Sequence, residues 1–237
     1  MKSRPILVGG VTLVSKLWLH PLDKPTSRKQ QSISARNLLR IACEIEEITL
    51  TEHELRLTGL ELITLFKERE QQSLSIAHCS SMLAIALAPG EVGVDCEGFG
   101  RTRKWPEIAR QFFAPGEAKK IESAKAEEIE SLFIRHWVLK EAYIKAVQGS
   151  IFGDLNRLVI DEKNNVSIEE NGFQDSWSAW EMRLCNTLVA VCDSGSSSIQ
   201  VFVVKSMSHT LADCSIEHLP EHIKPNKSAI SVRQLGQ

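Results

Sequence analysis

The order of apolar and polar positions along the chain predicts clusters of short strands separated by helices. A run rich in Val, Leu and Ile at residues 6–14 predicts a first strand. Residues 27–45 predict a helix, and residues 52–72, which are mixed and charged, predict a second one. Apolar residues of the first helix fall on or near one side: Ile33, Leu38, Ile41 and Cys43.

Strand character returns in three short apolar runs, at residues 74–79, 82–88 and 92–96. The turn dipeptide Pro89-Gly90 joins the last two. After residue 97 the pattern becomes basic and helical.

Three helices are predicted in the middle of the chain. Residues 105–113 form the first, and residues 115–124 form the second, because they open with Pro-Gly-Glu, which suits a helix start. The third and longest runs over about residues 127–148 and ends at Gly149.

The C-terminal part has the pattern of a β-meander. Residues 155–205 alternate short β-rich runs with turns such as Asn-Asn at 164–165 and Asn-Gly at 171–172. Residues 206–237 lose this periodicity and carry two prolines, so we expect a C-terminal tail there.

Each half of the chain offers one main helix followed by several strands, although no sequence repeat is visible. We therefore expect an N-terminal half at residues 1–96, a C-terminal half at residues 97–205, and the tail at residues 206–237. A chain of 237 residues with 43% hydrophobic content can bury a full core, as one large domain or two small halves.

Charge and hydropathy argue against nucleic-acid and membrane partners. The net charge is −2 and the pI is near 6.4, so no global field attracts nucleic acid or an anionic membrane. Glycines interrupt the run at residues 6–14, which is too short to span a bilayer and lacks the cleavage site of a signal peptide.

The six cysteines contain no C-x-x-C pair, which argues against a disulfide framework and a zinc cage. We expect reduced thiols and a cytoplasmic location. The cysteines are Cys43, Cys79, Cys96, Cys185, Cys192 and Cys214.

Two carboxylates lie close together in the run VGVDCE at residues 92–97. If this run is a strand, Asp95 and Glu97 project from the same face. They repel each other unless a cation lies between them, and oxygen ligands of this kind favour Mg²⁺. The alternative is a solvated acidic turn after a strand.

The run WVLKEAYIK at residues 137–145 belongs to the longest helix. Lys140 lies in an apolar stripe of that helix, so its ammonium group either extends to water or meets a bound phosphate. Glu141 and Lys145 are four residues apart, close enough to act on one ligand or on each other. The alternative is an ordinary surface salt bridge.

Two weaker signals lie upstream. His78 is inside a strand-like run, where a histidine is either a hydrogen-bonded core residue or a ligand. The run ARNLLR at residues 35–40 contains Arg36 and follows Lys24, Arg28 and Lys29. Such a group of basic side chains either holds a phosphate or forms a solvated helix face.

Together, GVDxE and, about forty residues later, WxxKExxxK resemble the motifs of the 4′-phosphopantetheinyl transferases. These enzymes move phosphopantetheine from coenzyme A onto a serine of a carrier protein. With the upstream histidine and the ARxLLR helix, the resemblance spans about residues 25–205. It implies an α+β fold of two similar α/β halves, a pseudo-dimer with the active site between them.

Chain length and the histidine resemble the larger, monomeric class, which activates secondary-metabolite enzymes such as surfactin synthetase. In that class Asp95, Glu97 and Glu141 would ligate Mg²⁺ against the pyrophosphate of coenzyme A. Glu141 would take the proton of the carrier serine, and Lys140 and Lys145 would neutralise charge on phosphoryl oxygens and on the leaving group, adenosine 3′,5′-bisphosphate.

The resemblance also implies that Arg28, Arg36 and His78 contact phosphates at the nucleotide end of coenzyme A. Two departures from the family pattern concern this end. The Gly-Lys-Pro tripeptide that helps hold adenine is missing from residues 59–72, and Ala77 and Cys79 replace serines beside the histidine.

A basic rim for an acidic carrier protein is expected after the carboxylate strand, with a solvated helix face as the alternative. Its members are Arg101, Arg103, Lys104, Arg110, Lys119 and Lys120. Aromatic residues are only 6% and do not interleave with these charges, so the rim does not have the pattern of a nucleic-acid platform.

Two other classes remain open: a different Mg²⁺-dependent phosphoryl-transfer enzyme, and a non-catalytic relative that only binds carrier proteins or coenzyme A. The joint presence of Asp95, Glu97, Glu141 and Lys145 argues against the second. The chain has no P-loop motif and no GxGxxG, which excludes the commonest nucleotide-binding alternatives. The sequence does not specify which carrier or pathway is served.

Overall fold

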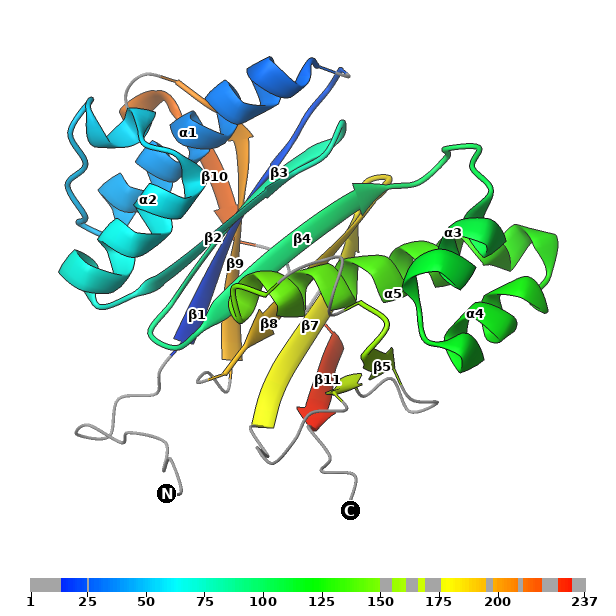
Figure 1. The fold of residues 1–237 in the computed structure, drawn as a ribbon. Coiled ribbons are helices and arrows are strands. Elements are labelled where there is room, and N and C mark those ends of the chain that lie inside the picture. Colours follow the sequence, from blue (N-terminus) through cyan, green and yellow to red (C-terminus); the bar gives the residue numbers. More distant parts are fainter. Residues whose placement is uncertain are drawn as a thin grey trace, which may run out of the picture.

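In the residues that it describes, the computed structural model has two main β-sheets, each with helices along one side, and a separate pair of short strands (Figure 1). The structure describes residues 14–24, 26–149, 155–160, 166–168, 176–194, 198–208, 211–218 and 226–231.

The larger sheet has five strands in the order β10-β9-β1-β3-β2. In that order the strands are Ser215–His218, Ser198–Ser206, Val14–Pro21, Met82–Ala88 and Ser73–His78. β1 pairs with β9 in parallel, and the other pairs of this sheet are antiparallel.

The second sheet has four antiparallel strands in the order β11-β7-β8-β4. In that order the strands are Asn226–Ser231, Ser176–Leu184, Thr187–Asp193 and Val92–Gly98. A separate pair consists of β5 (Leu158–Ile160) and β6 (Val166–Ile168).

The helices form two groups, one beside each sheet (Figure 1). Beside the five-stranded sheet are α1 (Arg28–Ile45), the 3-10 turn η1 (Glu54–Arg56), α2 (Gly59–Leu65) and the π turn η2 (Phe66–Glu70). Beside the four-stranded sheet are α3 (Trp105–Phe112), α4 (Pro115–Glu122) and α5 (Ala126–Ala146). A further 3-10 turn, η3, covers Leu211–Asp213.

Three apolar clusters join these parts into helix, sheet, sheet and helix layers. One lies between α1 and the five-stranded sheet and includes Leu38 and Ile85. A second lies between α5 and the four-stranded sheet and includes Leu139. The third lies between the two sheets, where Met82 of β3 and Val191 of β8 belong to one cluster.

The structure confirms a mixed α+β fold, and many of the elements predicted from the sequence. Ser27 caps α1, as its side chain accepts a hydrogen bond from the backbone N–H of Gln30, so this helix begins at the predicted place. β3 has the predicted bounds, because it is buried on both faces and therefore reads as one apolar run. In the described part of the chain, no helix is both long and apolar enough to cross a bilayer.

Two predictions about the N-terminal elements need correction, and the strand predicted over residues 6–14 lies almost entirely outside the described residues. The first described strand, β1, begins at Val14, and residues 6–13 lie outside the described part. Ile33 does not belong to the buried side of α1, because it is 47% exposed. The helix predicted over residues 52–72 is divided into η1, α2 and η2, since Thr58 starts a new helix with a capping box.

Part of the predicted tail consists of paired strands. β10 pairs with β9, and β11 pairs with β7, so residues 215–218 and 226–231 extend the two sheets. The pairing of these two strands depends on partner strands that are distant in sequence, and a local pattern does not reveal such partners. The predicted turns at residues 164–165 and 171–172 lie outside the described residues.

Strand pairing crosses the predicted boundary between the halves. The boundary at residues 96 and 97 falls within β4, which pairs with β8 of the four-stranded sheet. In return, β9 crosses to the five-stranded sheet and pairs with β1. Each sheet therefore combines strands from both sides of the predicted boundary.

Candidate active site

The site is built where β4 lies against α5. Alternate residues of β4, namely Val92, Val94 and Cys96, belong to the cluster between the two sheets. Asp95 and Glu97 alternate with these residues along the strand, so their side chains point to the opposite face. Figure 1 shows α5 running along this strand.

Gly93 allows this close approach of strand and helix. A Cβ atom at this position would lie 1.9 Å from the backbone oxygen of Ala142 and 2.5 Å from the backbone nitrogen of Ala146. Both atoms belong to the backbone of α5, so neither can rotate away. The absence of a side chain here therefore brings the C-terminal turns of α5 against the carboxylate strand.

Asp95, Glu141 and Lys145 meet at this contact. The Nζ of Lys145 is 2.6 Å from the Oδ1 of Asp95 and 4.0 Å from the Oε2 of Glu141. The Asp95 and Glu141 side chains are 9% and 12% exposed, whereas that of Lys145 is 32% exposed. The group is thus buried on the protein side and open at the lysine.

Glu97 lies at the outer edge of the same face and pairs with Arg101. The Nη1 of Arg101 is 3.3 Å from the Oε2 of Glu97, and its Nη2 donates to the Oγ of Ser80 at 3.2 Å. Backbone N–H groups of Gly100 and Arg101 both donate to Glu130 of α5 at 2.9 Å. These bonds hold the segment after β4 beside the site.

All three carboxyl groups have raised pKa values. Burial raises the pKa of Glu141 to about 7, with a further contribution from the charge of Asp95. Burial also raises the pKa of Asp95, against the effect of Lys145, and the pKa of Glu97, against the effect of Arg101. For Lys145, burial opposes the charge, but Asp95 and Glu141 outweigh it and raise the pKa.

Three carboxylates that repel one another fit a divalent cation. Asp95, Glu97 and Glu141 supply only oxygen donors, the type that Mg²⁺ prefers. Within the described residues, no three acidic, histidine or cysteine side chains are already arranged as a metal cluster. Instead, Lys145 donates a hydrogen bond to Asp95. By charge and by donor type, the residues fit Mg²⁺.

His78 brings the five-stranded sheet to the same place. It is the last residue of β2, and its Nδ1 is 3.1 Å from the Oε1 of Gln31 on α1. Burial lowers its pKa, and the positive charges of Lys145 and Arg28 lower it further. Arg28 itself is exposed at the start of α1. The site therefore combines residues of both sheets.

Arg36 is held away from the carboxylates by the loop before α2. Its Nη2 donates to the backbone oxygen of Leu57 at 2.8 Å, and burial lowers its pKa. Its Nη1 is buried and makes no hydrogen bond. This guanidinium group therefore has a buried donor that no protein group satisfies.

Lys140 is not part of the site, contrary to the prediction. Its side chain is completely buried and donates to Glu117 of α4 and to the backbone oxygen of Leu155, the latter at 3.0 Å. Its Nζ also lies 4.4 Å from the ring centre of Phe113. Because consecutive helix residues point about 100° apart, Glu141 faces β4 while Lys140 faces α4. The ion pair of Lys140 is structural.

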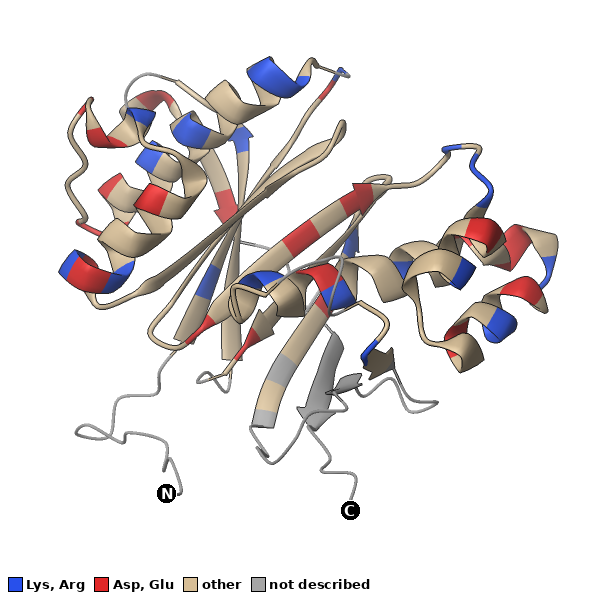
Figure 2. Ribbon diagram, viewed as in Figure 1, with Lys and Arg blue, Asp and Glu red and all other residues tan. Residues whose placement is uncertain are grey.

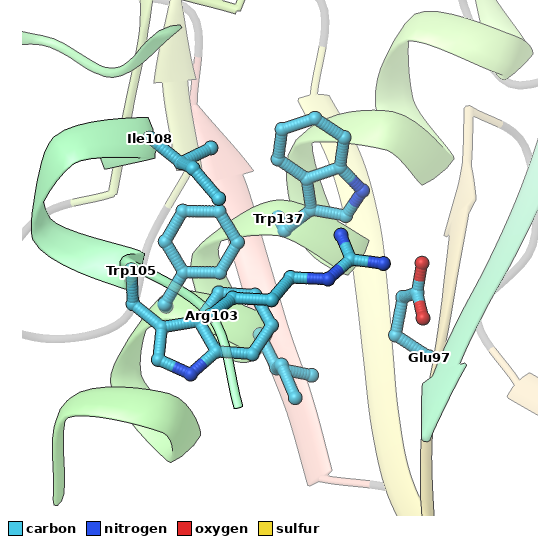
Figure 3. Close-up of a pocket in the computed structure, with 7 residues that line it drawn as sticks. Glu97, Arg103, Trp105, Ile108 and Trp137 are labelled. Atoms are coloured by element: carbon cyan, nitrogen blue, oxygen red, sulfur yellow. The ribbon is translucent and has the colours of Figure 1, made fainter. Parts of the chain in front are cut away.

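A small apolar pocket with a cavity volume of about 60 Å³ borders Glu97, a feature that sequence reasoning missed. In Figure 3, Trp105, Ile108 and Trp137 line one side, and Arg103 extends across toward Glu97. Trp137 also hydrogen-bonds to Glu141, which joins the pocket to the carboxylates. The aromatic residues at helical spacing along α5 were the signal for it in the sequence.

The predicted basic rim is partly neutralised. Figure 2 shows Lys and Arg on the segment before α3 and on α4, with acidic residues among them. Lys104 pairs with Glu107 at 3.3 Å, and Arg110 pairs with Glu122. Lys119 and Lys120 are exposed on α4.

The site thus brings together carboxylates, a lysine and a histidine from β4, α5 and β2. A model of the 4′-phosphopantetheinyl transferase superfamily matches residues 91–192, the range that contains β4 and α5. The chain is 35% identical over 173 residues to slr0495 of Synechocystis sp., whose name as a 4′-phosphopantetheinyl transferase is provisional. That match covers 68% of this chain and 67% of the relative.

Two shorter matches carry the same name. The 4′-phosphopantetheinyl transferase HetI of Nostoc sp. is 34% identical over 78 residues, 32% of this chain and 33% of HetI. The 4′-phosphopantetheinyl transferase gsp of Aneurinibacillus migulanus is 28% identical over 94 residues, 40% of this chain and 39% of gsp. The chain belongs to the 4′-phosphopantetheinyl transferase superfamily, and it is a phosphopantetheinyl transferase enzyme.

Proposed function

We propose that the chain transfers the 4′-phosphopantetheine group from coenzyme A to a serine hydroxyl of an apo acyl- or peptidyl-carrier protein. The observation that carries the proposal is the contact of β4 with α5, which brings Asp95 and Glu141 to Lys145 and Glu97 close to Glu141. Family membership supports the same reaction. The second product is adenosine 3′,5′-bisphosphate.

Asp95, Glu97 and Glu141 would hold Mg²⁺ at this contact. A bound Mg²⁺ ion shields the negative charge of a pyrophosphate from an attacking hydroxyl oxygen. Arg101 and Lys145 keep the carboxylate group compact, since Arg101 pairs with Glu97 and Lys145 pairs with both Asp95 and Glu141.

The transfer step follows from the positions of Glu141 and Lys145 on one face of α5. The serine oxygen bonds to the phosphorus that carries pantetheine, and the bond from that phosphorus to the bridging oxygen breaks. Glu141 takes the serine proton, directly or through water. The electron pair of the broken bond stays on adenosine 3′,5′-bisphosphate, where Lys145 stabilises the negative charge.

His78, Arg28 and Arg36 are proposed to bind the phosphates at the nucleotide end. The unpaired buried Nη1 of Arg36 and the location of His78 near Lys145 support this assignment. Residues 59–72, where the family has Gly-Lys-Pro, form α2 and η2 instead, so adenine must be held by other residues.

The apolar pocket beside Glu97 is proposed to receive the pantetheine arm. Its lining of Trp105, Phe133 and Trp137 suits the dimethyl segment of that arm, and its position next to Glu97 suits a group attached to the reacting phosphorus. The exposed cations of the rim, such as Arg103 and Lys119, would meet an acidic carrier protein.

The finer features of the fold are also proposals. We propose a pseudo-dimer of two α/β halves, because helices lie along one side of each sheet and the site draws residues from both sheets. The six cysteines are free, which supports action in the reducing cytoplasm. A monomer of the larger class is consistent with the match to gsp.

Incubation with coenzyme A, Mg²⁺ and a panel of apo-carrier proteins tests the function. The intact mass of at least one carrier should rise by one phosphopantetheine, and adenosine 3′,5′-bisphosphate should form in equal amount. Glu141→Gln should block transfer, whereas Glu128→Gln, an exposed change in the first turn of the same helix, should not. Binding of coenzyme A without transfer to any carrier would instead support a non-catalytic relative.

A further inference from the structure

Gln31 is a buried polar residue that the proposed mechanism does not use. It lies in the first turn of α1, and only 7% of it is exposed. Its amide makes two hydrogen bonds, one to the backbone oxygen of Thr26 and one to His78. A buried amide with partners at both ends has a fixed orientation.

The orientation of the amide determines which end faces His78. Its Nε2 donates to the oxygen of Thr26 at 2.8 Å, and that carbonyl oxygen can only accept. The Oε1 of Gln31 therefore faces the Nδ1 of His78, at 3.1 Å. Because an amide oxygen also only accepts, the Nδ1 of His78 must carry the hydrogen.

This bond has a consequence for the other ring nitrogen. A neutral imidazole carries one hydrogen, so with Nδ1 protonated the Nε2 presents a lone pair. A phosphate oxygen at neutral pH accepts hydrogen bonds and cannot pair with that lone pair. His78 can donate to a phosphate through Nε2 only after it gains a second proton.

The surroundings of His78 keep it neutral when no anion is bound. Lys145 of α5 and Arg28 of α1 face it with positive charge, and Asp95 of β4 faces it with negative charge. Burial and the two cations outweigh Asp95 and lower the pKa of His78. An incoming phosphate adds negative charge and reverses this balance.

We propose that Gln31 is a positioning residue that holds His78 as the Nδ1-protonated tautomer, so that a phosphate ligand binds His78 as the imidazolium and brings one proton with it. This inference rests on the proposed function for the identity of the ligand, coenzyme A. The tautomer of His78 is independent of that identity and is tested first.

Nitrogen-15 NMR of the ligand-free protein reports the tautomer directly. At a pH above the His78 titration, the wild-type spectrum should show Nδ1 protonated and Nε2 bare. In Gln31→Met the acceptor is lost, and the population should shift toward the Nε2-protonated form. Gln30→Met, the same change at the exposed neighbouring residue, is the matched control and should leave the wild-type pattern.

Because the wild-type spectrum is decisive by itself, the test does not depend on the folding of a variant. An Nε2-protonated His78 in the wild-type protein would overturn the inference. So would an unchanged tautomer in folded Gln31→Met.

Titration calorimetry with coenzyme A at pH 7.5, in two buffers of different ionisation enthalpy, measures the proton that enters with the ligand. At this pH the phosphate monoester of coenzyme A is already a dianion, because the second pKa of such a group is about 6. The wild-type protein and Gln30→Met should take up about one proton more than His78→Asn. The proton uptake of Gln31→Met in excess of His78→Asn should be less than half of the wild-type excess, because the neutral His78 of this variant can donate through Nε2.

The two proposals fail in different ways. Coenzyme A that binds with the same proton uptake in the wild-type protein and in Gln31→Met would overturn the role of Gln31 and leave the proposed function intact. If coenzyme A does not bind the wild-type protein, the proposed function fails, and the tautomer measured by NMR still decides the role of Gln31.

Discussion

Two lysine clusters on α5 have similar components and opposite properties. Lys140 meets one carboxylate, Glu117, and the pair is sealed between α4 and α5. Lys145, five residues later, meets Asp95 and Glu141, with Glu97 beyond them, and its side chain is 32% exposed. One cluster is balanced and closed, and the other is acidic and open.

The difference shows what separates a structural ion pair from a reactive one. The positive charge of Lys140 is matched by the negative charge of Glu117, and the pKa of the lysine is lowered mainly by burial. Around Lys145 the carboxylates outnumber the lysine, and their pKa values are raised. An excess of negative charge that is open to solvent favours the binding of a further cation, and this is a property expected of a substrate site.

The largest expected effect is on the open cluster. Asp95→Ala and Glu97→Ala should each reduce transfer about a thousandfold or more, because each removes a ligand that stabilises charge in the transition state. The measurement is the initial rate of carrier modification, with and without excess chelator. Asp213→Ala, an exposed change in η3, is the control. Full transfer in the presence of chelator would show that no cation is required.

Substitutions in the closed cluster should lower the stability of the protein and leave the rate of transfer nearly unchanged. Lys140→Met leaves Glu117 buried without its partner, so the free energy of unfolding should fall by about 3–5 kcal/mol. Denaturant unfolding measures this loss, and kcat of the folded variant at low temperature should stay within about threefold of the wild-type value. The double variant Glu117→Leu/Lys140→Met should be more stable than Lys140→Met alone. A large fall in kcat with normal stability would place Lys140 in the active site after all.

A kinetic double-mutant cycle compares the two residues that share the open face of α5. Glu141→Gln and Lys145→Met should each lower kcat by about a hundredfold at saturating coenzyme A. Since both act on one transition state, the double variant should lose less than the product of the single losses. Strictly multiplicative losses would mean that they act separately.

The smallest expected effect is a pH-dependent change in stability. Because the pKa of Glu141 is raised from 4.5 to about 7 in the folded state, folding favours its neutral form. Its contribution to stability is complete below pH 4.5 and is lost as the pH rises through about 7. In metal-free protein, Glu141→Gln should therefore be more stable than the wild type by about 1–3 kcal/mol at pH 8.

Unfolding curves at pH 5 and pH 8 in the presence of chelator measure this difference, which should shrink at the lower pH. Added Mg²⁺ should narrow the gap at pH 8, because it stabilises the wild-type carboxylates and has less to bind in the variant. An equal difference at both pH values would show that Glu141 is not held in its neutral form by the fold.

Local patterns predicted the parts of this site that lie on regular elements. Period-two spacing placed Asp95 and Glu97 on one face of β4, and i, i+4 spacing placed Glu141 and Lys145 together on α5. The structure adds that these two faces meet. The order of the sheets and the paired strands β10 and β11 depend on partners far away in the sequence, which explains why they were missed.

The same limit explains the error at Lys140. Its position in an apolar stripe was read correctly, but its partner Glu117 lies on another helix, and no spacing rule connects them. The bond between Gln31 and His78 joins residues of α1 and β2 and was invisible for the same reason. The sequence identifies polar residues in apolar surroundings, and only the fold shows which neighbour pairs with each of them.

At Gly93 the main chain itself sets the distance between β4 and α5 in the candidate site. Here the carboxylate strand and α5 are spaced by contact of two backbones, with no side chain between them whose rotamer could change the distance. Even a methyl group at residue 93 would push the helix away and pull Lys145 from Asp95. Any side chain at residue 93 would therefore change the spacing between the side chains that β4 and α5 contribute to this site.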